Sequence, residues 1–370
     1  MTLPGLPAMD VAGRLPRLRA TLAGAGCEAL LVTDLVNIRY LTGFSGSAAH
    51  LLVLPDTLVL ATDGRYRQQA AEELAAARVE ARFVVGTVAA QREGLAPEVR
   101  GVGRLGLEAA SVTWARQRAF AGEWFPDVDL VPTEGLVEGL RRVKDGGEVA
   151  RIAEAARIAD AALAAVKPLL LDGVTEADFA VALDFEMRRL GAAGVSFDSI
   201  VAGGPNGARP HARPSDRPVR PGELVVLDFG ALVDGYHSDM TRTVCAGEPA
   251  SPTLSRMVDV VRESQAAGVA AVRAGATCAD VDRTCREVIA GAGWGDAFVH
   301  GTGHGVGLLI HEAPWVGATS TDTLAAGHVV TVEPGVYLPD HGGVRIEDTV
   351  VVTESGCEPL THAPKDLVLT

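Results

Sequence analysis

The 370-residue sequence lacks the features of a nucleic-acid-binding or membrane protein. Acidic residues outnumber Lys and Arg by 47 to 33, and the formal net charge of −14 argues against nucleic acid or an anionic membrane as the main partner. No apolar run reaches the roughly 20 residues that cross a bilayer. The stretch Met1 to Asp10 has no basic segment before an apolar core, so we expect no secretory leader. We therefore expect a cytoplasmic protein that binds neither nucleic acid nor membrane.

Cysteine is also scarce, and its positions show no metal-binding spacing. The five cysteines are an odd number and are scattered along the chain, which argues against both a disulfide framework and a zinc-thiolate site. Cys278 and Cys285 lie two turns apart on a predicted helix, where we interpret them as packing residues. We expect reduced thiols.

What is present indicates a globular protein of class α/β with two domains. Hydrophobic residues make up 48% of the chain and charged residues 22%, and 370 residues suffice for two cores. Strand-like and helix-like segments alternate to about Pro132, and a charged, Gly-containing stretch from Leu140 to Gly147 then precedes a long helical pattern from about Glu148 to Leu170. We place the boundary in that stretch, which gives domains 1–140 and 141–370. In the first domain we expect helices at 13–26 and 68–77 and strands at 29–32, 50–54 and 57–62.

The stretch from Leu224 to Cys245 predicts a β-hairpin with two acidic side chains on one face. Its turn is Asp234-Gly235, the strongest short signal for a two-residue hairpin loop. With that turn, Asp228 lies opposite Thr241, and Asp239 is one diagonal step away on the same face, roughly 7–8 Å distant at the backbone. Such carboxylates are either solvated at a sheet edge or form half of a metal site, because buried anions repel one another unless a cation joins them.

The second half of the chain contains an internal repeat. Gly173 to Asp178 matches Gly275 to Asp280, and each segment has a threonine in the position of a helix N-cap. Pro221 to Gly230 likewise matches Ala326 to Gly335, and both segments are apolar and strand-like. A unit of two helices followed by two strands is therefore predicted to occur twice.

Each repeat carries an acid in both of its strands. Asp228 in the first repeat aligns with Glu333 in the second, and a second acidic strand follows each, with Asp239 in the first and Glu347 in the second. Chance similarity between apolar strands would not readily place an acid at the same point of both strand pairs. Four carboxylates make a hard, oxygen-rich site that suits divalent cations.

Histidines gather in and around the glycine-rich stretch from Phe298 to Gly307. His300 and His304 have little core to fill there, so a site is favoured over packing, and the glycines leave room for the close approach of a ligand. First-row transition metals usually take an imidazole beside carboxylates. His311 is equally compatible with a site and with the surface, whereas His211, flanked by Pro-containing sequence, would more often be a surface residue.

These motifs resemble those of the metallopeptidases with the pita-bread fold, which are methionine aminopeptidase, prolidase and aminopeptidase P. The resemblance implies a creatinase-type N-terminal α/β domain and a C-terminal pita-bread domain built from two pseudo-symmetric helix–helix–strand–strand repeats. The segments from Asn37 to Phe44 and from Asp63 to Tyr66 resemble the creatinase-type domain, which methionine aminopeptidases lack. The branch of prolidase and aminopeptidase P is therefore favoured. On sequence grounds alone, Asp63 and Arg65 are expected to order their loop as a pair.

The resemblance also implies a site for two divalent ions. An oxygen-dominated site with one imidazole favours Mn²⁺, with Co²⁺, Zn²⁺ and Fe²⁺ as alternatives. Its metal ligands would be Asp228, Asp239, His304, Glu333 and Glu347. The catalytic residues would be His211, His300, His311, Glu333 and Arg345, and the substrate contacts Tyr337, His211, His300 and His311. Asp228 and Glu347 would bridge both ions, and Glu333 would act as general acid and base. His237 shares a face with Asp239 but matches no ligand position, which favours a supporting or exposed role.

The activity implied by the resemblance is hydrolysis of an Xaa-Pro bond by a metal-bridged hydroxide. The segments quoted above from the first domain favour an Xaa-Pro aminopeptidase, which acts at the N-termini of proline-containing peptides. The alternative is an Xaa-Pro dipeptidase, or prolidase. A catalytically inactive peptide-binding module of the same fold is disfavoured because every ligand position is filled. The family resemblance further suggests a homodimer.

Overall fold

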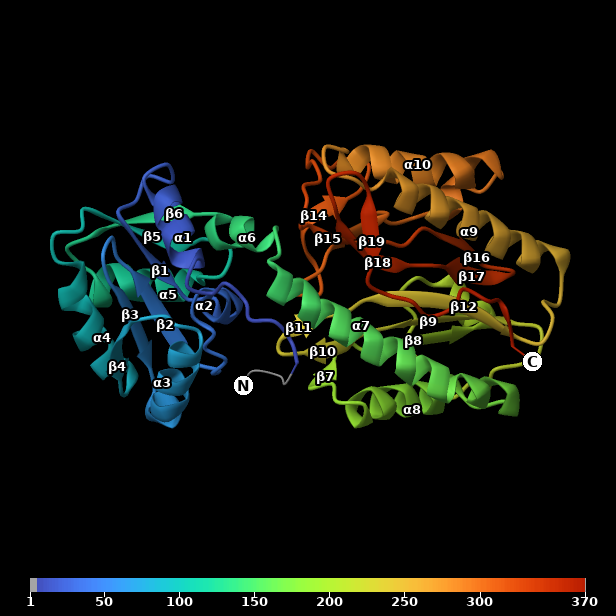
Figure 1. Ribbon diagram of the computed structural model, residues 1–370, viewed down its shortest axis with the longest axis horizontal. Coiled ribbons are helices and arrows are strands. Elements are labelled where there is room, and N and C mark those ends of the chain that lie inside the picture. The colour runs from blue at the N-terminus through green and yellow to red at the C-terminus, as the bar shows by residue number, and fades with distance from the viewer. Residues whose placement is uncertain (1–4, 370) are drawn as a thin grey trace. The chain divides into compact units, whose positions relative to one another are not determined.

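The computed structural model describes residues 5–369. The chain divides between Arg141 and Arg142 into two compact units, here called unit 1 and unit 2 (Figure 1). Among the described residues, no helix is both long and apolar enough to cross a membrane.

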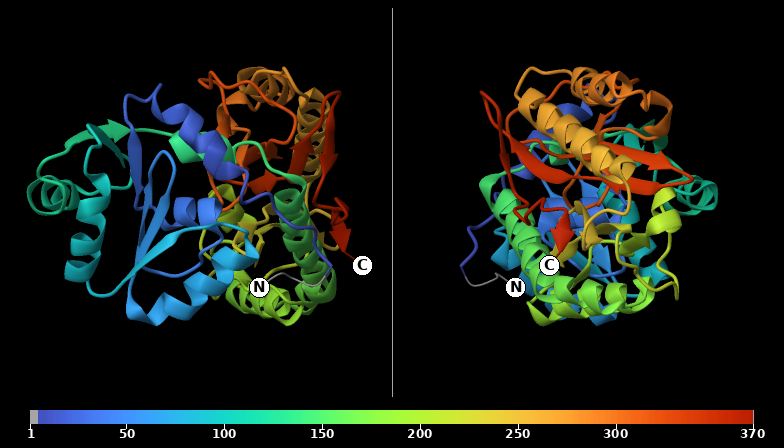
Figure 2. Two further views of the ribbon diagram at one scale, coloured as in Figure 1. Left: turned by 60° about the vertical axis from the view of Figure 1, so that its left-hand side comes forward. Right: turned by 90° about the vertical axis from the view of Figure 1, so that its right-hand side faces the viewer.

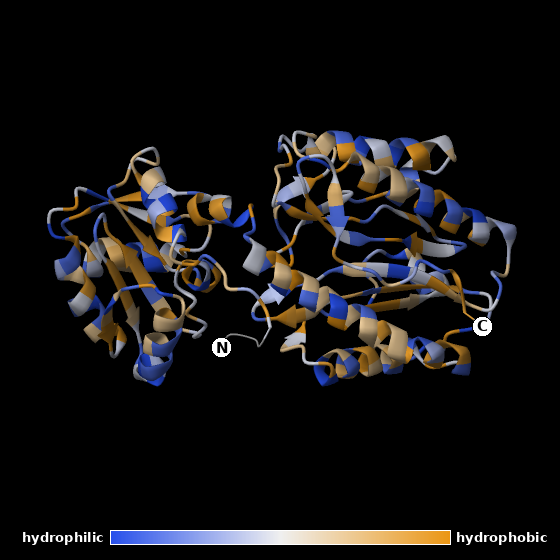
Figure 3. Ribbon diagram, in the orientation of Figure 1, coloured by the Kyte–Doolittle hydropathy of each residue, from blue (hydrophilic) through white to orange (hydrophobic). Residues whose placement is uncertain are grey.

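Unit 1 is a six-stranded sheet with the strand order β4-β3-β2-β1-β5-β6. The strands are β1 (Ala29–Val32), β2 (Ala49–Val53), β3 (Leu58–Thr62), β4 (Arg82–Val85), β5 (Arg104–Glu108) and β6 (Asp129–Thr133). The helices are α1 (Arg14–Leu22), α2 (Leu35–Thr42), α3 (Arg67–Ala76), α4 (Val88–Leu95), α5 (Trp114–Ala119) and α6 (Leu136–Arg141). The central strands β1 and β3 are hydrophobic and fully buried, whereas the surrounding helices carry hydrophilic residues (Figure 3). Unit 1 is therefore the α/β layer structure that the alternating pattern predicts.

The segments that resemble the creatinase-type domain have structural roles within unit 1. Tyr40, Leu41 and Phe44 are buried in and after α2. The guanidinium of Arg65 donates two hydrogen bonds to Asp63, at 3.0 and 2.7 Å, which confirms the expected loop-ordering pair.

Unit 2 is built from two helix pairs with strands between them. Helices α7 (Gly146–Val166) and α8 (Glu176–Arg189) lie on one side of the strands, and α9 (Pro252–Ala271) and α10 (Cys278–Gly291) lie on the other (Figures 1 and 2). The first group of strands is β7 (Gly194–Val195), β8 (Ile200–Gly203), β9 (Leu224–Phe229), β10 (Ala231–Val233), β11 (Tyr236–His237) and β12 (Met240–Ala246). The second group is β13 (Gly303–Gly305), β14 (Glu312–Val316), β15 (Val329–Val332), β16 (Gly335–Leu338), β17 (Gly342–Arg345), β18 (Asp348–Val352), β19 (Cys357–Pro359) and β20 (Val368–Leu369).

The predicted repeat is visible in matching details of the two halves. Thr175 and Thr277 cap α8 and α10, and each side chain accepts a hydrogen bond from the amide three residues on. Each threonine also forms an isolated antiparallel bridge, one with Pro218 and the other with Thr323. The long helix predicted at 148–170 ends earlier, at Val166, because Pro168 has no N–H to continue its hydrogen-bond ladder.

The first hairpin has the register that its turn predicts. Val233 pairs with Tyr236 across Asp234-Gly235, whose φ angles of 48° and 77° are those of a two-residue hairpin turn. Further along, Asp228 pairs with Thr241. The same register puts Asp239 opposite Gly230, on the face that carries Asp228.

The second hairpin follows its own register and corrects one part of the repeat. Val332 pairs with Asp348 and Gly335 with Arg345, so Glu333 and Glu347 face each other. Asp228 and Glu333 are therefore equivalent positions, as predicted. The second acids are not, since Asp239 occupies the position of Arg345, and Glu347 that of Thr241. The offset is two residues, which keeps all of these side chains on one face because a strand alternates with a period of two.

Gly230 is expected to be essential to this hairpin. A Cβ at this position would lie 1.9 Å from the carbonyl oxygen of Ser238, so the Gly230→Ala variant must displace backbone. We expect its free energy of unfolding to fall by about 1–3 kcal/mol in denaturant titrations. The matched control is Gly291→Ala, at the end of α10, where a Cβ meets nothing within 4 Å and a gain of up to about 1 kcal/mol is expected. Equal stability of the two variants would contradict the close packing of the hairpin.

Candidate active site

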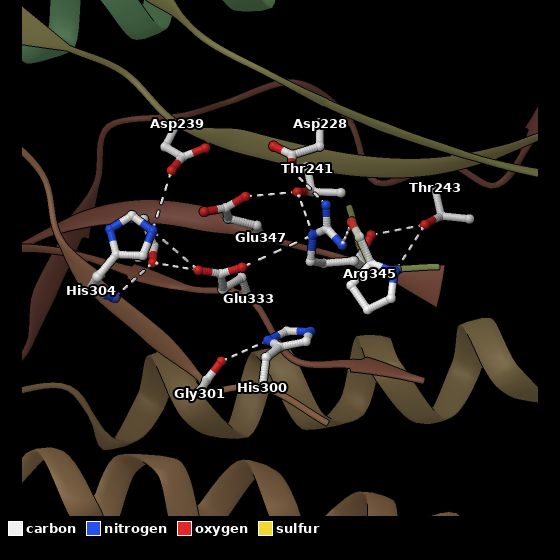
Figure 4. A network of polar contacts seen from close by, with 12 residues as sticks. Asp228, Asp239, Thr241, Thr243, His300, Gly301, His304, Glu333, Arg345 and Glu347 are labelled. Carbon is white, nitrogen blue, oxygen red and sulfur yellow. Dashed lines mark hydrogen bonds and ion pairs between the residues drawn. The ribbon is translucent and has the colours of Figure 1, made fainter. Parts of the chain in front are cut away.

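Four buried or partly buried carboxylates from the two hairpins converge in unit 2. Asp228, Asp239 and Glu347 each present an oxygen within 4.8 Å of the other two, and Glu333 lies beside them (Figure 4). Asp228 Oδ1 and Glu347 Oε1 are fully buried and have no hydrogen-bond partner among the described residues. Unpaired carboxylate oxygens are costly in a protein interior, so this arrangement calls for a cation.

His304 of β13 turns one ring nitrogen toward this cluster. Its Nδ1 lies 3.1 Å from the carbonyl oxygen of Gly305, which can only accept, so Nδ1 carries the proton. Nε2 lies 3.3 Å from Glu333 Oε1 and 3.5 Å from Asp239 Oδ2. It donates to these carboxylates when the ring is protonated, and it offers a lone pair to a metal ion when the ring is neutral. A backbone carbonyl that fixes the tautomer in this way is the usual support of a metal-binding imidazole.

The glycines around His304 serve the packing of strands. A Cβ on Gly303 would lie 2.0 Å from the carbonyl oxygen of Thr331, and one on Gly305 would lie 2.5 Å from that of Ala313. Gly303 also lines the cavity, and the close approach of a ligand expected along this stretch stays a prediction. Both glycines allow β13 to lie close against its neighbours, which places His304 over the carboxylates.

Arg345 ties the two hairpins together. Its side chain is 3% exposed, and its Nη2 donates to Asp228 Oδ2 at 2.5 Å. Its Nε donates to the hydroxyl of Thr241 at 3.0 Å, and that hydroxyl donates in turn to Glu347 Oε2 at 2.7 Å. Each hairpin thus supplies one residue, Thr241 or Arg345, that bonds an acid of the other (Figure 4).

One guanidinium does not neutralise four carboxylates. Burial, with repulsion from the neighbouring acids, raises the pKa of Asp239 and of Glu347 well above their usual values. Burial likewise raises the pKa of Asp228. Burial acts in the same direction on Glu333, but in the metal-free site the hydrogen bond and the charge of the protonated His304 ring outweigh it and hold the Glu333 pKa at about 2. Without added positive charge, some of these acids must take up protons.

Tyr337 and His300 form a directed chain of hydrogen bonds behind Arg345. Arg345 Nη1 donates to the Tyr337 hydroxyl at 2.7 Å, and that hydroxyl lies 2.9 Å from His300 Nε2. His300 Nδ1 lies 2.8 Å from the carbonyl oxygen of Gly301, so Nδ1 is the donor and Nε2 accepts from Tyr337. Burial raises the Tyr337 pKa to about 12 and lowers the pKa of His300, so the hydroxyl keeps its proton and the imidazole is neutral.

Tyr337 and His300 were expected to contact the substrate, and this chain of hydrogen bonds already occupies polar groups of both. Both nitrogens of His300 already have protein partners, although the residue lines the cavity above the carboxylates. Tyr337 is buried and does not line that cavity. The geometry therefore favours an indirect role for both, in holding Arg345, and their direct contact with a substrate stays a prediction.

His211 and His311 are the histidines free to meet a ligand. Both line the cavity, both are exposed, and neither has a hydrogen bond or ion pair with the described residues. The ring of His311 packs edge-on against His304, with centroids 4.3 Å apart, and stacks on Trp315 at 6.5 Å. His237 does not line the cavity, and its Nδ1 lies near Ser196. The supporting or exposed role expected of it stays a prediction.

The cavity has a volume of about 480 Å³ and opens over the acidic cluster. It is lined by the five candidate ligands and Arg345. Its walls include residues that carry no sequence motif and were not predicted, namely Phe197, Asp198, Ile200, Arg213, Ile310 and Trp315. The position of Thr241 opposite Asp228 was predicted from the hairpin register and is confirmed, but its bond to Glu347 was not predicted.

The donor set fits divalent metal. One imidazole nitrogen and several carboxylate oxygens converge, two of those oxygens are buried without partners, and two divalent cations would bring four positive charges to four carboxylates. Asp228, Asp239, His304, Glu333 and Glu347 are the residues that could hold them.

Comparison with known proteins agrees with this geometry. Metallopeptidase family M24 matches residues 150–354, and the creatinase/prolidase N-terminal domain matches residues 14–143. The chain is similar to the Xaa-Pro dipeptidase from Bacillus anthracis, with 39% identity and a TM-score of 0.93 over 97% of this chain and 100% of that one. It is also similar to the X-Pro aminopeptidase from Thermotoga maritima, with 35% identity and a TM-score of 0.87 over 95% and 100%. The peptidase YqhT of Bacillus subtilis is 40% identical over 96% of this chain and 99% of its own.

These matches cover both units and confirm the fold expected from the sequence, a creatinase-type N-terminal domain followed by a pita-bread domain. The chain therefore belongs to metallopeptidase family M24, and its similar structures include Xaa-Pro peptidases.

Proposed function

We propose that this metallopeptidase hydrolyses the bond between an N-terminal residue and a following proline. The observation that carries the proposal is the cavity itself, in which free histidines and apolar walls stand over a buried carboxylate cluster suited to two divalent cations. The similar structures named as an Xaa-Pro dipeptidase and an X-Pro aminopeptidase support the same bond.

The Xaa-Pro bond explains why a dedicated site is needed. Proline has no N–H to donate in the strand-like groove that general peptidases use, and its ring fixes φ. Phe197, Ile310 and Trp315 give the cavity an apolar wall that suits a rigid ring.

Two divalent cations held by Asp228, Asp239, His304, Glu333 and Glu347 would polarise the scissile carbonyl and lower the pKa of a shared water, and we propose Mn²⁺ for both. The Glu333 carboxylate can accept a proton from the attacking water and return it to the leaving nitrogen. Arg345 keeps Asp228 oriented through a bond of 2.5 Å. His211 and His311, with free ring nitrogens, can donate to the substrate or to the oxyanion of the tetrahedral state.

Two kinds of substrate are candidates: longer peptides that begin with Xaa-Pro, and the Xaa-Pro dipeptide alone. An aminopeptidase acting on longer peptides was expected from segments of the first domain, but Tyr40, Leu41 and Phe44 are accounted for by packing within unit 1. The similarity at 39% identity to an Xaa-Pro dipeptidase favours a strict dipeptidase as the second candidate. A homodimeric state and a cytoplasmic location stay predictions.

Of the predictions from the proposed function, the first concerns the substrate. Purified enzyme loaded with Mn²⁺ should cleave an Xaa-Pro dipeptide or an Xaa-Pro-Yaa tripeptide, and a chelator should abolish the cleavage. Release of the first residue from the tripeptide would identify an aminopeptidase, and cleavage of the dipeptide alone a dipeptidase. Failure to cleave either peptide with metal bound would refute the proposed substrate class and would favour the inactive peptide-binding module.

The second prediction concerns Glu333. The Glu333→Gln variant keeps the shape of the side chain but removes its proton-accepting charge, so kcat should fall by about 10²–10⁴-fold at saturating metal. Metal content is measured alongside, and the exposed Glu354→Gln serves as the control. Activity within a few-fold of the unmodified enzyme would remove Glu333 from the proton transfer.

The third prediction concerns pH and metal together. In the metal-free protein the pKa of Asp239 is raised, so its stabilising contribution is present at low pH and is lost as pH rises through the folded pKa. With chelator, Asp239→Asn should therefore melt at a higher temperature than the unmodified protein, by a margin that grows from about pH 5 to pH 8. With Mn²⁺ the order should reverse, because metal at 100 times its Kd stabilises the intact site by about 2.7 kcal/mol.

The control for this experiment is Glu358→Gln, which removes an exposed charge on β19. It should shift neither melting curve. Equal stabilisation of the unmodified and Asp239→Asn proteins by Mn²⁺ would show that Asp239 is not a ligand.

A further inference from the structure

A buried ion pair joins Lys144 to Glu312 outside the cavity. Lys144 Nζ lies 2.9 Å from Glu312 Oε1, and the two side chains are 1% and 9% exposed. Neither residue lines the cavity. Burying two charges has a desolvation cost that their attraction only roughly offsets, so stability alone is a weak account of the pair.

Glu312 stands next to two histidines of the site. It follows His311 directly and opens β14, where it pairs with Gly305, the residue after His304. A bulge between His304 and Gly305 interrupts the register at this point. The backbone that carries Glu312 therefore also sets the positions of both imidazoles, whose rings pack 4.3 Å apart.

The loop before Glu312 is shaped to admit its carboxylate. A Cβ on Gly307 would lie 2.3 Å from Glu312 Oε1, so only glycine leaves room for the acid here. The carbonyl of Gly307 accepts a hydrogen bond of 2.9 Å from the amide of His237. The loop is thus held from one side by backbone and from the other by the ion pair.

Lys144 is itself held firmly. Its amide donates to the carbonyl of Gly327 at 2.9 Å, in the turn before β15. The next residue, Asp145, caps α7 and accepts from the amide of Glu148 at 2.9 Å. The ammonium therefore projects from a fixed point of the backbone.

We propose that Lys144 is a positioning residue for His311, acting through Glu312. The ion pair fixes the start of β14, so that His311 lies against His304 and faces the cavity. This inference rests on the proposed function in one respect, that His311 acts on the peptide substrate.

The test combines two single variants and their double. Lys144→Met removes the charge while keeping most of the side-chain length, and Glu312→Gln removes the partner charge while keeping its shape. Each should lower kcat by about 10- to 100-fold, as does the loss of supporting contacts at other metal sites, with KM changed by less than about threefold. Because the two residues act as one unit, the double variant should lose no more kcat than the more damaged single. Lys144→Arg, which keeps a donor, should recover part of the loss.

Arg151→Met is the matched control. Arg151 lies in α7, seven residues after Lys144, and is likewise buried. Its Nε pairs with Asp234 at 2.7 Å, and neither Arg151 nor Asp234 lines the cavity. This variant should lose stability while the kcat of the folded enzyme is unchanged. If Lys144→Met behaves like Arg151→Met, or if the two losses multiply in the double variant, the positioning role is wrong.

A second readout separates this inference from the proposed function. ¹⁵N-histidine NMR spectra record the side chains of His304 and His311 without any substrate. If the unmodified enzyme cleaves no Xaa-Pro peptide, the proposed function fails, and the spectra alone decide the positioning role. Displacement of both signals in Lys144→Met but not in Arg151→Met supports it, and unchanged signals in Lys144→Met overturn it.

Discussion

Four carboxylates that repel one another share one buried space in unit 2, and the rest of the site depends on how this repulsion is balanced. Asp228, Asp239 and Glu347 approach within 4.8 Å, two of their oxygens have no partner among the described residues, and Arg345 is the guanidinium bonded to the cluster. Such a group is unfavourable unless positive charge is added. The cluster, the cross-hairpin bonds and the orientation of His304 are together explained by two divalent cations. Membership of a metallopeptidase family agrees with this explanation.

The two repeats supply this site through similar backbones with different side chains. Asp228 and Glu333 occupy equivalent positions, but the facing strands differ by an offset of two residues. Because strands alternate with a period of two, the offset leaves every acid on the same face. It also puts Thr241 opposite Asp228 and Arg345 two residues before Glu347, where each bonds an acid of the other hairpin. The pseudo-symmetry thus places the acids, and the departure from it links the hairpins.

The sequence predicted best those features that are set by residues close together in the chain. The Asp234-Gly235 turn sets the hairpin register by itself, so the placement of Asp228 opposite Thr241 could be derived and is confirmed. The second hairpin has no such turn, and the facing of Glu333 and Glu347 emerged only from the structure.

Features that depend on tertiary packing could not be predicted from the sequence. Phe197 and Trp315 come to the cavity from separate segments, and the tight contact of Gly303 with Thr331 reflects strand packing that sequence cannot show.

The central claim is that the cluster holds two cations. Anomalous diffraction from crystals grown with Mn²⁺, recorded at the manganese edge, tests it most directly. The account predicts two peaks between the hairpins, beside the side chains of Asp228, Asp239, His304, Glu333 and Glu347. No peak there, or peaks only elsewhere on the chain, would contradict it.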